Sequence, residues 1–456
     1  MAKRLPAVFV GHEIYRQAAY GTNHPLAIPR VAPVMDLCRA LGWLGPGEFH
    51  ASPRASEREL AWFHTRDYVD ALRRATEAGI VDIEARERYR LGTMENPLFP
   101  GVFERAATSV GGSIRAAELA LEGRIAYHPA GGTHHGRPDR AAGFCYFNDP
   151  VFAILALLRG GCERILYGDL DAHHGDGVQD AFADDPRVWT ISIHEQGRWP
   201  NTGALDDVGV GRACNLPVPR GFGDRELALL LDEVVLPLVG EVAPQAVVLT
   251  CGADALAADP LSSMALTNVA LWSAAERLAD LAPAAVVLGG GGYNPWTVTR
   301  YWTGLWGRLS GRKIPASLPE VARAILARLH SDLIDDEDVR EAWLTTLADE
   351  PNDAPARAEV RQLRDAALAR ADRAAWRQPA CTADVSGEAA RGAGTSGSRR
   401  SKSWKTRRST PRSSRSASAP RPARSAGRSA SRPRPSRPTR AASSRAAART
   451  ASPLSR

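Results

Sequence analysis

The sequence contains no long hydrophobic run. Although 44% of its 456 residues are hydrophobic, no apolar stretch approaches the ~20 residues that a helix needs to cross a bilayer. The N-terminal stretch MAKRLPAVFVGHE begins with basic residues, but its apolar part is too short for a signal peptide and is predicted to form a strand. The six cysteines show no short repeated spacing, which argues against a disulfide framework or a cysteine-rich zinc site. These absences predict a cytoplasmic protein with no membrane partner.

Acidic residues are absent from the last part of the chain. Residues 391–456 contain 19 Lys and Arg and no Asp or Glu, so the preceding residues carry a net charge of −12 although the whole chain carries +7. From about residue 385 the composition is reduced to mainly Ser, Arg, Ala, Pro and Gly, which cannot bury enough apolar surface to offset the entropy of ordering. We therefore predict a folded domain over 1–376 and a disordered, low-complexity tail over 377–456. The tail could bind nucleic acid through phosphate contacts, or it could be sequence without a function, such as the product of a shifted reading frame.

Six short apolar segments have the character of buried strands and alternate with segments of helical periodicity. Such an alternation predicts a parallel sheet covered by helices on both faces. The helical pattern continues to about residue 376. The predicted strands are AVFVG (7–11), RIAYH (124–128), RILYGD (164–169), VWTISIH (188–194), AVVLTCG (246–252) and AVVLGGGG (285–292), and two of the predicted helices are VFERAATSVGGSIRAAELALEG (102–123) and RELALLLDEVVLPLVGEV (225–242).

Ionisable side chains follow four of the predicted strands. In an open parallel sheet, ligands bind beyond the carboxyl ends of the strands. Any one of these strand ends would usually be a solvated polar loop, but aspartate is costly to bury alone, and four such ends together favour a shared site. The residues concerned are His134 and His135, then Asp169, Asp171, His173 and Asp176, then Asp254, and finally Tyr293.

Three of these residues could form a metal site. An extended segment would direct Asp171 and His173 to the same side, and Asp254 could add a third ligand from a neighbouring loop. Two carboxylates and one imidazole leave an open coordination position, as a hydrolytic metal requires. Zn²⁺ accepts this set, and Fe²⁺ or Mn²⁺ would also suit it, so the sequence leaves the metal open.

The remaining residues could supply acid–base groups. The tandem His134 and His135 could take a proton from water and protonate an amine leaving group. Asp169 and Asp176 could each accept the far ring N–H of one histidine. Tyr293 follows four glycines, so its hydroxyl could approach a substrate closely and donate a hydrogen bond to the oxyanion of a tetrahedral intermediate. Together these residues predict metal-assisted hydrolysis of an amide.

Four segments of the chain resemble, in order, signature segments of the histone deacetylase family. They are GGTHHGRPDRAAGFCYFND, DLDAHHGDGVQDAF, CGADALAADPL and GGGGYN. The resemblance extends from about residue 8 to 310, and IYRQAAYGTNHPLAIPRV and MENPLFPGVFERA are similar to the bacterial acetoin-utilisation branch. It implies a three-layer arginase/deacetylase-type α/β fold with a central, mostly parallel sheet of about eight strands. It also implies a zinc-dependent or Fe²⁺-dependent deacetylase acting on lysine side chains of proteins, and the acetoin-utilisation branch implies a target such as acetyl-CoA synthetase.

The resemblance also implies catalytic roles. The three ligands named above would bind a single metal ion. His135, paired with Asp176, would be the general base and then the general acid. His134, paired with Asp169, would be an electrostatic partner, and Tyr293 would polarise the carbonyl group.

Further residues are implied to contact the substrate or a second ion. Glu95 would hold the substrate backbone at the rim, and Arg30 would lie beside an inner acetate cavity. Polyamine deacetylases of the family carry an acidic residue at the position of Leu261, so the resemblance favours acyl-lysine over acetylpolyamine. The narrow tube for the acyl-lysine side chain would be lined by Gly143, Phe144 and Trp199. A structural potassium ion would lie near Asp169, Asp171, His173 and Ser192.

Two other functions stay open from the sequence. One is the hydrolysis of acetylpolyamine or another small-molecule amide. The other is a non-catalytic role in which the basic tail binds nucleic acid, although intact Tyr293, His135 and metal ligands argue against it.

One residue departs from the family pattern, because Gly168 stands where valine or another strand-compatible residue is usual. Glycine weakens a strand by roughly 0.5–1 kcal/mol, so we expect lower stability with the chemistry retained.

Overall fold

The computed structural model describes residues 4–17, 19–21, 24–370 and 376. At the centre of this part of the chain lies one sheet of eight strands, in which every neighbouring pair is parallel. The strands are β1 (Val8–Gly11), β2 (Phe49–Ala51), β3 (Ile125–His128), β4 (Ile165–Asp169), β5 (Val188–Glu195), β6 (Ala213–Val218), β7 (Ala246–Thr250) and β8 (Ala284–Leu288). Their order across the sheet is β2-β1-β3-β8-β7-β4-β5-β6. The predicted parallel sheet of about eight strands is confirmed, whereas the predicted tail over 377–456 lies outside the described residues.

The two strands that the sequence pattern did not reveal lie at the two edges of the sheet. β2 has only three residues, and none of them is fully buried, so it lacks a continuous apolar run. β6 has the sequence ACNLPV, in which Asn215 and Pro217 interrupt the apolar pattern. An edge strand tolerates proline because one side of its backbone has no partner strand. Edge position therefore explains why both strands were missed.

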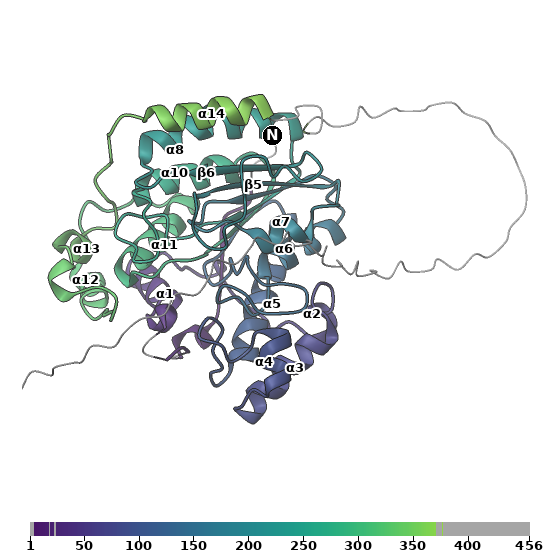
Figure 1. Cartoon of the computed structure of the whole chain (residues 1–456). Coiled ribbons are helices and arrows are strands. Elements are labelled where there is room, and N and C mark those ends of the chain that lie inside the picture. Colours follow the sequence, from purple (N-terminus) through teal and green to yellow (C-terminus); the bar gives the residue numbers. More distant parts are fainter. Residues whose placement is uncertain (1–3, 18, 22–23, 371–375, 377–456) are drawn as a thin grey trace, which may run out of the picture. The chain divides into compact units, whose positions relative to one another are not determined.

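Helices cover both faces of the sheet (Figure 1). Side chains alternate along each strand, so in β4 Ile165 and Tyr167 pack with one helical layer and Leu166 packs with the other. No helix of the described part of the chain combines the length and apolar character needed to span a membrane. One layer contains α2 (Glu57–Leu60), α3 (Arg66–Ala78), α4 (Ile83–Tyr89), α5 (Val102–Leu121), α6 (Asp149–Arg159) and α7 (Asp176–Ala181). The other contains α1 (Val31–Ala40), α8 (Asp224–Leu230), α9 (Leu236–Val242), α10 (Asn268–Ala279), α11 (Pro295–Leu309), α12 (Glu320–Leu326), α13 (Glu341–Thr345) and α14 (Ala358–Arg370).

The predicted helix over 225–242 is divided by a π-helical turn. This turn, Leu231–Val235, joins α8 to α9 without a break in the chain direction. Pro237 follows it and has no backbone N–H to donate to the preceding turn, so the local hydrogen bonds are displaced by one residue. The predicted helix over 102–123 is present as α5, which packs against β3 and β8.

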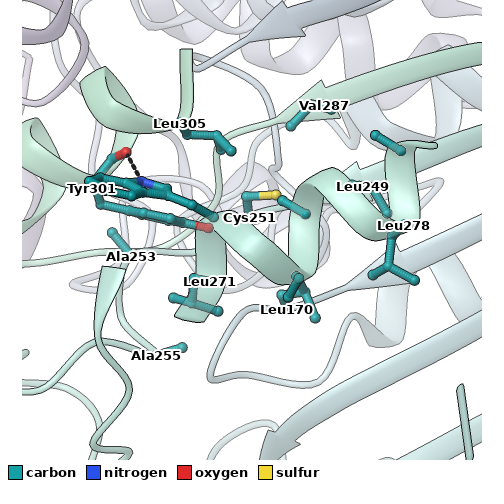
Figure 2. Close-up of a cluster of buried hydrophobic side chains, with 14 of the residues drawn as sticks. Leu170, Leu249, Cys251, Ala253, Ala255, Leu271, Leu278, Val287, Tyr301 and Leu305 are labelled. Atoms are coloured by element: carbon teal, nitrogen blue, oxygen red, sulfur yellow. Dashed lines mark hydrogen bonds between the residues drawn. The ribbon is translucent and has the colours of Figure 1, made fainter. Parts of the chain in front are cut away.

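Gly168 lies in the middle of β4, beside a cluster of buried hydrophobic side chains. Figure 2 shows Leu249 of β7 and Leu278 of α10 in this cluster. A Cβ atom on Gly168 would lie 2.8 Å from Leu249 Cδ2, closer than carbon atoms pack. The space that a valine would occupy is therefore filled by Leu249. The lower stability expected for glycine stays a prediction, and Gly168→Val would itself displace Leu249.

The order of the central strands decides where the ionisable residues meet. β3, β8, β7 and β4 are adjacent and parallel, so their carboxyl ends share one edge of the sheet. The segments 129–148, 170–175, 251–267 and 289–294 leave these strands at that edge. Residues more than 100 positions apart in the sequence are brought together in this way.

Candidate metal-dependent active site

Asp171, His173 and Asp254 lie together beyond the ends of β4 and β7. One ligand atom from each residue lies within 4.8 Å of the others. His173 Nδ1 is 3.2 Å from Asp171 Oδ1 and 2.9 Å from Asp254 Oδ2. Both carboxylates are completely buried. Two buried carboxylates facing one imidazole nitrogen fit a bound cation, because its charge would offset the cost of burying theirs.

The backbone around these three residues orients their side chains. The extended segment that we predicted over 171–173 is wrong, because the chain bends there. The N–H of His173 donates to Asp171 Oδ1 (3.0 Å), and the N–H of Ala172 donates to Asp254 Oδ1 (3.0 Å). The N–H of Gly291 donates to Asp171 Oδ2 (2.6 Å), and a Cβ atom on Gly291 would collide with Asp254. A bend with backbone donors therefore brings both side chains to the site, and glycine after β8 permits the close approach.

His134 and His135 each hydrogen-bond a carboxylate through Nδ1. The distance is 2.7 Å from His134 to Asp169 Oδ2 and 2.8 Å from His135 to Asp176 Oδ1. The two rings lie side by side, with their centroids 4.0 Å apart. Because a neutral imidazole carries its single proton on the donating nitrogen, these bonds leave the Nε2 atom of His135 free to accept a proton.

The two histidines are driven to different protonation states. Burial, followed by the positive charge of His134, lowers the pKa of His135 to about 3. Burial also acts to lower the pKa of His134, but the carboxylates of Asp169 and Asp171 outweigh it and raise that pKa to about 9. The arrangement favours a neutral His135 and a protonated His134 at neutral pH, which suits a base beside an electrostatic partner.

Two supporting residues were missed in the sequence. Arg137 forms an ion pair with Asp176, and the hydroxyl of Tyr167 donates a hydrogen bond of 2.7 Å to Asp169 Oδ2. A sequence signal existed for both of them. Arg137 follows His135 by two positions. Tyr167 lies two positions before Asp169 in the same strand, so the side chains of Tyr167 and Asp169 share a face of the sheet.

Tyr293 lies at the same edge, in the loop after β8. It is buried, and its ring centroid lies 6.5 Å from that of His173 and 6.0 Å from that of Phe144. Its backbone N–H donates a hydrogen bond of 2.7 Å to Asp259 Oδ2. Asp259 is a third residue that the sequence did not single out. Its Oδ1 accepts from the N–H of Leu261 at 2.9 Å, so one carboxylate holds both loop segments.

A cavity of about 650 Å³ forms the mouth of the site. Trp199 is 42% exposed at this mouth, and its ring centroid lies 4.6 Å from the ring centroid of His135. The N–H of Gly143 donates to Glu95 Oε1 at 2.8 Å. A Cβ atom on Gly143 would collide with the Trp199 ring, and its φ of +56° is one that glycine adopts readily. The cavity is lined by five of the predicted substrate residues, Glu95, Gly143, Phe144, Trp199 and Leu261, together with His135, His173 and Tyr293.

The sixth predicted substrate residue, Arg30, lines a second cavity of about 400 Å³, the inner cavity, which extends from Tyr293 to the exposed residues Arg16 and Gln17. Its Nη1 donates to the carbonyl oxygens of Gly290 (2.8 Å) and Gly292 (3.4 Å). Ser192, predicted near a potassium ion, lies opposite Asp169 in the neighbouring strand β5. Its hydroxyl is 2.9 Å from His194 Nδ1.

Comparison with known proteins identifies relatives of the same architecture. The family model for the histone deacetylase domain matches residues 24–309. Histone deacetylase 8 of Xenopus tropicalis is 36% identical over 64% of this chain and 80% of its own length. The acetoin utilization protein AcuC of Bacillus subtilis is 35% identical over 67% of this chain and 82% of its own length. The crystal structure of a histone deacetylase homologue from Aquifex aeolicus is 37% identical, covers 80% of this chain and all of its own, and superimposes with a TM-score of 0.76.

Proposed function

Since the chain belongs to the histone deacetylase family, we propose that it is a metal-dependent hydrolase that removes acetyl groups from lysine side chains of proteins. The observation that carries this proposal is a cluster of three buried ligands at one edge of the sheet, whose member His173 lines one cavity together with the carboxylate-paired His135 and Tyr293. Such a constellation supplies the groups that amide hydrolysis needs: a metal site, a proton acceptor and an oxyanion donor.

We assign the metal to Asp171, His173 and Asp254. Zn²⁺ is the first choice for this ligand set and Fe²⁺ the second. A divalent ion supplies Lewis acidity toward the amide carbonyl and toward water when it is bound there. Asp169 and Ser192, adjacent across β4 and β5, would hold a structural potassium ion with Asp171 and His173.

His135 transfers the proton in the proposed reaction. Its Nε2 accepts the proton of the attacking water and passes it to the lysine Nζ as the C–N bond breaks. Asp176 keeps the other proton on Nδ1, so the ring does not rotate or change tautomer. His134, held by Asp169, places a positive charge beside the reacting atoms and favours the negative charge that develops there.

Tyr293 supplies the last of these groups. Its hydroxyl donates a hydrogen bond to the carbonyl oxygen, and this bond strengthens as that oxygen gains charge. Asp259 holds the backbone of Tyr293, so the hydroxyl does not have to be ordered during the reaction.

The residues at the mouth favour acyl-lysine as the substrate. Phe144 and Trp199 would flank the aliphatic part of the lysine side chain, and Glu95 would accept a hydrogen bond from the substrate backbone at the rim. Leu261 offers no charge to a polyamine. An acetylated metabolic enzyme such as acetyl-CoA synthetase is the target we propose.

The proposal is tested by turnover of the purified chain on acetyl-lysine peptides and on acetylpolyamines. We expect hydrolysis of the peptides, loss of activity after chelation, and recovery with Zn²⁺ or Fe²⁺. Metal-loaded Tyr293→Phe is the matched control, because it keeps the ligands and removes one donor. Faster turnover of acetylpolyamines than of peptides would show that the substrates are small molecules and not proteins. Failure to hydrolyse either substrate with either metal would refute the proposed reaction.

A further inference from the structure

The inner cavity carries two guanidinium groups that no carboxylate of the described residues neutralises. Arg30 and Arg105 both line it, and among the described residues neither forms an ion pair. A third arginine of the same wall, Arg16, differs in this respect. It pairs with Glu13 at 2.8 Å and with Asp36 at 2.7 Å. Two of the three arginines that line the cavity therefore lack a counter-ion in the part of the chain that the structure describes.

Both groups keep hydrogen-bond donors for a ligand. Arg105 Nη1 donates to the carbonyl oxygens of Ile14 (3.2 Å) and Gln17 (3.5 Å), and the guanidinium lies 5.1 Å from the centroid of the Tyr15 ring. Arg30 uses only Nη1, toward the loop that carries Tyr293. The Nε and Nη2 atoms of both arginines have no acceptor among the described residues. A planar guanidinium whose Nε–Nη2 edge is free offers two parallel N–H groups, which match the geometry of a carboxylate.

A third donor lines this cavity. The Tyr15 side chain is only 6% exposed, and its hydroxyl makes no hydrogen bond of ordinary geometry within the described residues, the Ser109 side chain being its one weak partner. Burying a hydroxyl with so weak a partner is unfavourable, and an acceptor atom of a ligand would improve its hydrogen bonding. Burial lowers the pKa of Arg105, and the nearby charge of Arg30 acts in the same direction. An anion between the two arginines would relieve both effects.

The cavity is continuous with the reacting groups. Asp171, His173 and Tyr293 line it as well, so an acyl group whose carbonyl lies at the metal site would extend its remaining atoms into this space. The volume of about 400 Å³ is in the range of pockets that hold whole small ligands, and it exceeds what a two-carbon acetyl group fills.

We propose that the inner cavity binds the terminal carboxylate of a longer acyl chain, held between Arg30 and Arg105 with Tyr15 as an additional donor. The preferred substrates are then carboxyacyl-lysines of the succinyl and glutaryl class. This inference rests on the proposed function, keeps its reaction and its lysine side chain, and extends its acyl group from acetyl to a longer carboxyacyl chain. The reaction is unchanged: water adds to the amide carbon, the C–N bond breaks, the lysine amine takes a proton, and a dicarboxylate leaves.

The test compares peptides of one sequence that carry acetyl-, succinyl- or succinamoyl-lysine. The succinamoyl group has the length of succinyl but ends in a neutral amide. We expect a succinyl to succinamoyl ratio of kcat/KM of about 10- to 100-fold in the wild-type chain, the range for a hydrogen bond to a charged group. Arg105→Met should bring the ratio close to one, and Arg105→Lys should preserve part of it. Arg16→Met removes a paired cation from the same wall and should leave the ratio unchanged.

The ratio is measured within each variant, so partial loss of folded protein does not affect it. Hydrolysis of the acetyl peptide with a ratio near one would overturn the inference and leave the proposed function standing. A ratio near one combined with inhibition by free succinate that Arg105→Met abolishes would also overturn it, because the cavity would then bind a released acid. Hydrolysis of no peptide, acetyl included, would refute the proposed function and the inference together.

Discussion

The backbone N–H of Tyr293 donates a hydrogen bond of 2.7 Å to Asp259 Oδ2, which joins the loop after β8 to the loop after β7. The other oxygen of the same carboxylate accepts from the N–H of Leu261, at the mouth of the cavity. Neither bond involves a metal ligand. Asp259 therefore determines the position of Tyr293 and Leu261 without taking part in metal binding.

Asp259→Ala should lower kcat while leaving the metal content unchanged. The substitution leaves the buried N–H of Tyr293 and the half-buried N–H of Leu261 without an acceptor and releases the Tyr293 backbone. A small misplacement of a catalytic group costs about 10- to 100-fold. Single-turnover rates and elemental analysis on the same preparation measure both quantities. Asp206→Ala, an exposed position in a loop, is the control. Wild-type kcat in Asp259→Ala would show that Tyr293 is positioned by other contacts.

Tyr293→Phe should reduce the chemical step on the order of 10²–10³-fold, the usual cost of removing one oxyanion donor. The ring and its packing against Phe144 remain, so the fold and the metal site should be preserved. Single-turnover assays of the metal-loaded variant on an acetyl-lysine peptide measure the effect. A rate within a factor of about three of wild type would remove Tyr293 from the mechanism.

Asp171→Ala and Asp254→Ala should abolish both metal content and deacetylation, because each removes an anionic ligand from a site that has only three. Asp176→Asn is the matched comparison. It is buried and lies at the same edge, but it contacts His135 instead of the metal site, so it should keep the metal and lose turnover. Full metal occupancy in either alanine variant, by elemental analysis, would contradict the ligand assignment.

His64 should make the fold sensitive to acid. Its Nδ1 is 3.0 Å from the carbonyl oxygen of Arg137, and its Nε2 accepts from the N–H of Asn148 at 3.2 Å. A second ring proton would remove that acceptor. Burial lowers the pKa of His64 from 6.5 to about 3, although hydrogen bonds to backbone carbonyls oppose the shift.

Because the unfolded chain binds the proton more readily, the stability due to neutral His64 is present above pH 6.5 and is lost as the pH falls toward 3. The slope for one such group reaches about 1.4 kcal/mol per pH unit. Denaturant unfolding between pH 7.5 and 4.5 should show a shallower slope for His64→Gln than for wild type. The exposed His330→Gln should not change it. Equal slopes in all three proteins would exclude His64 as the titrating group.

Deletion of residues 386–456 should leave peptide deacetylation unchanged and weaken binding to nucleic acid. This segment holds 19 Lys and Arg after residue 390 and one aromatic residue, Trp404, so binding would depend on salt-sensitive phosphate contacts and little on base stacking. Turnover and nucleic-acid binding at two salt concentrations test it. A large loss of turnover would place this segment within the catalytic unit.

Local patterns in the sequence were sufficient for much of the fold. Six apolar runs predicted six of the eight strands, because strands buried on both faces are continuously apolar. β2 and β6 were not predicted because edge strands do not need that pattern. The bend at 171–173 was not predicted because it depends on backbone donors and on the carboxylate of Asp254, which lies 82 positions from Ala172 in the sequence.

By itself, the sequence determined which chemical groups the protein has and which strand each one follows, since both are properties of short segments. Only the tertiary structure decided which groups meet. The pairing of His135 with Asp176 spans 41 positions, the bond between Tyr293 and Asp259 spans 34, and Arg105 reaches the cavity of Arg30 from the first turn of α5. These contacts follow from the strand order β3-β8-β7-β4, which depends on how all the helices pack onto the sheet and not on any local pattern.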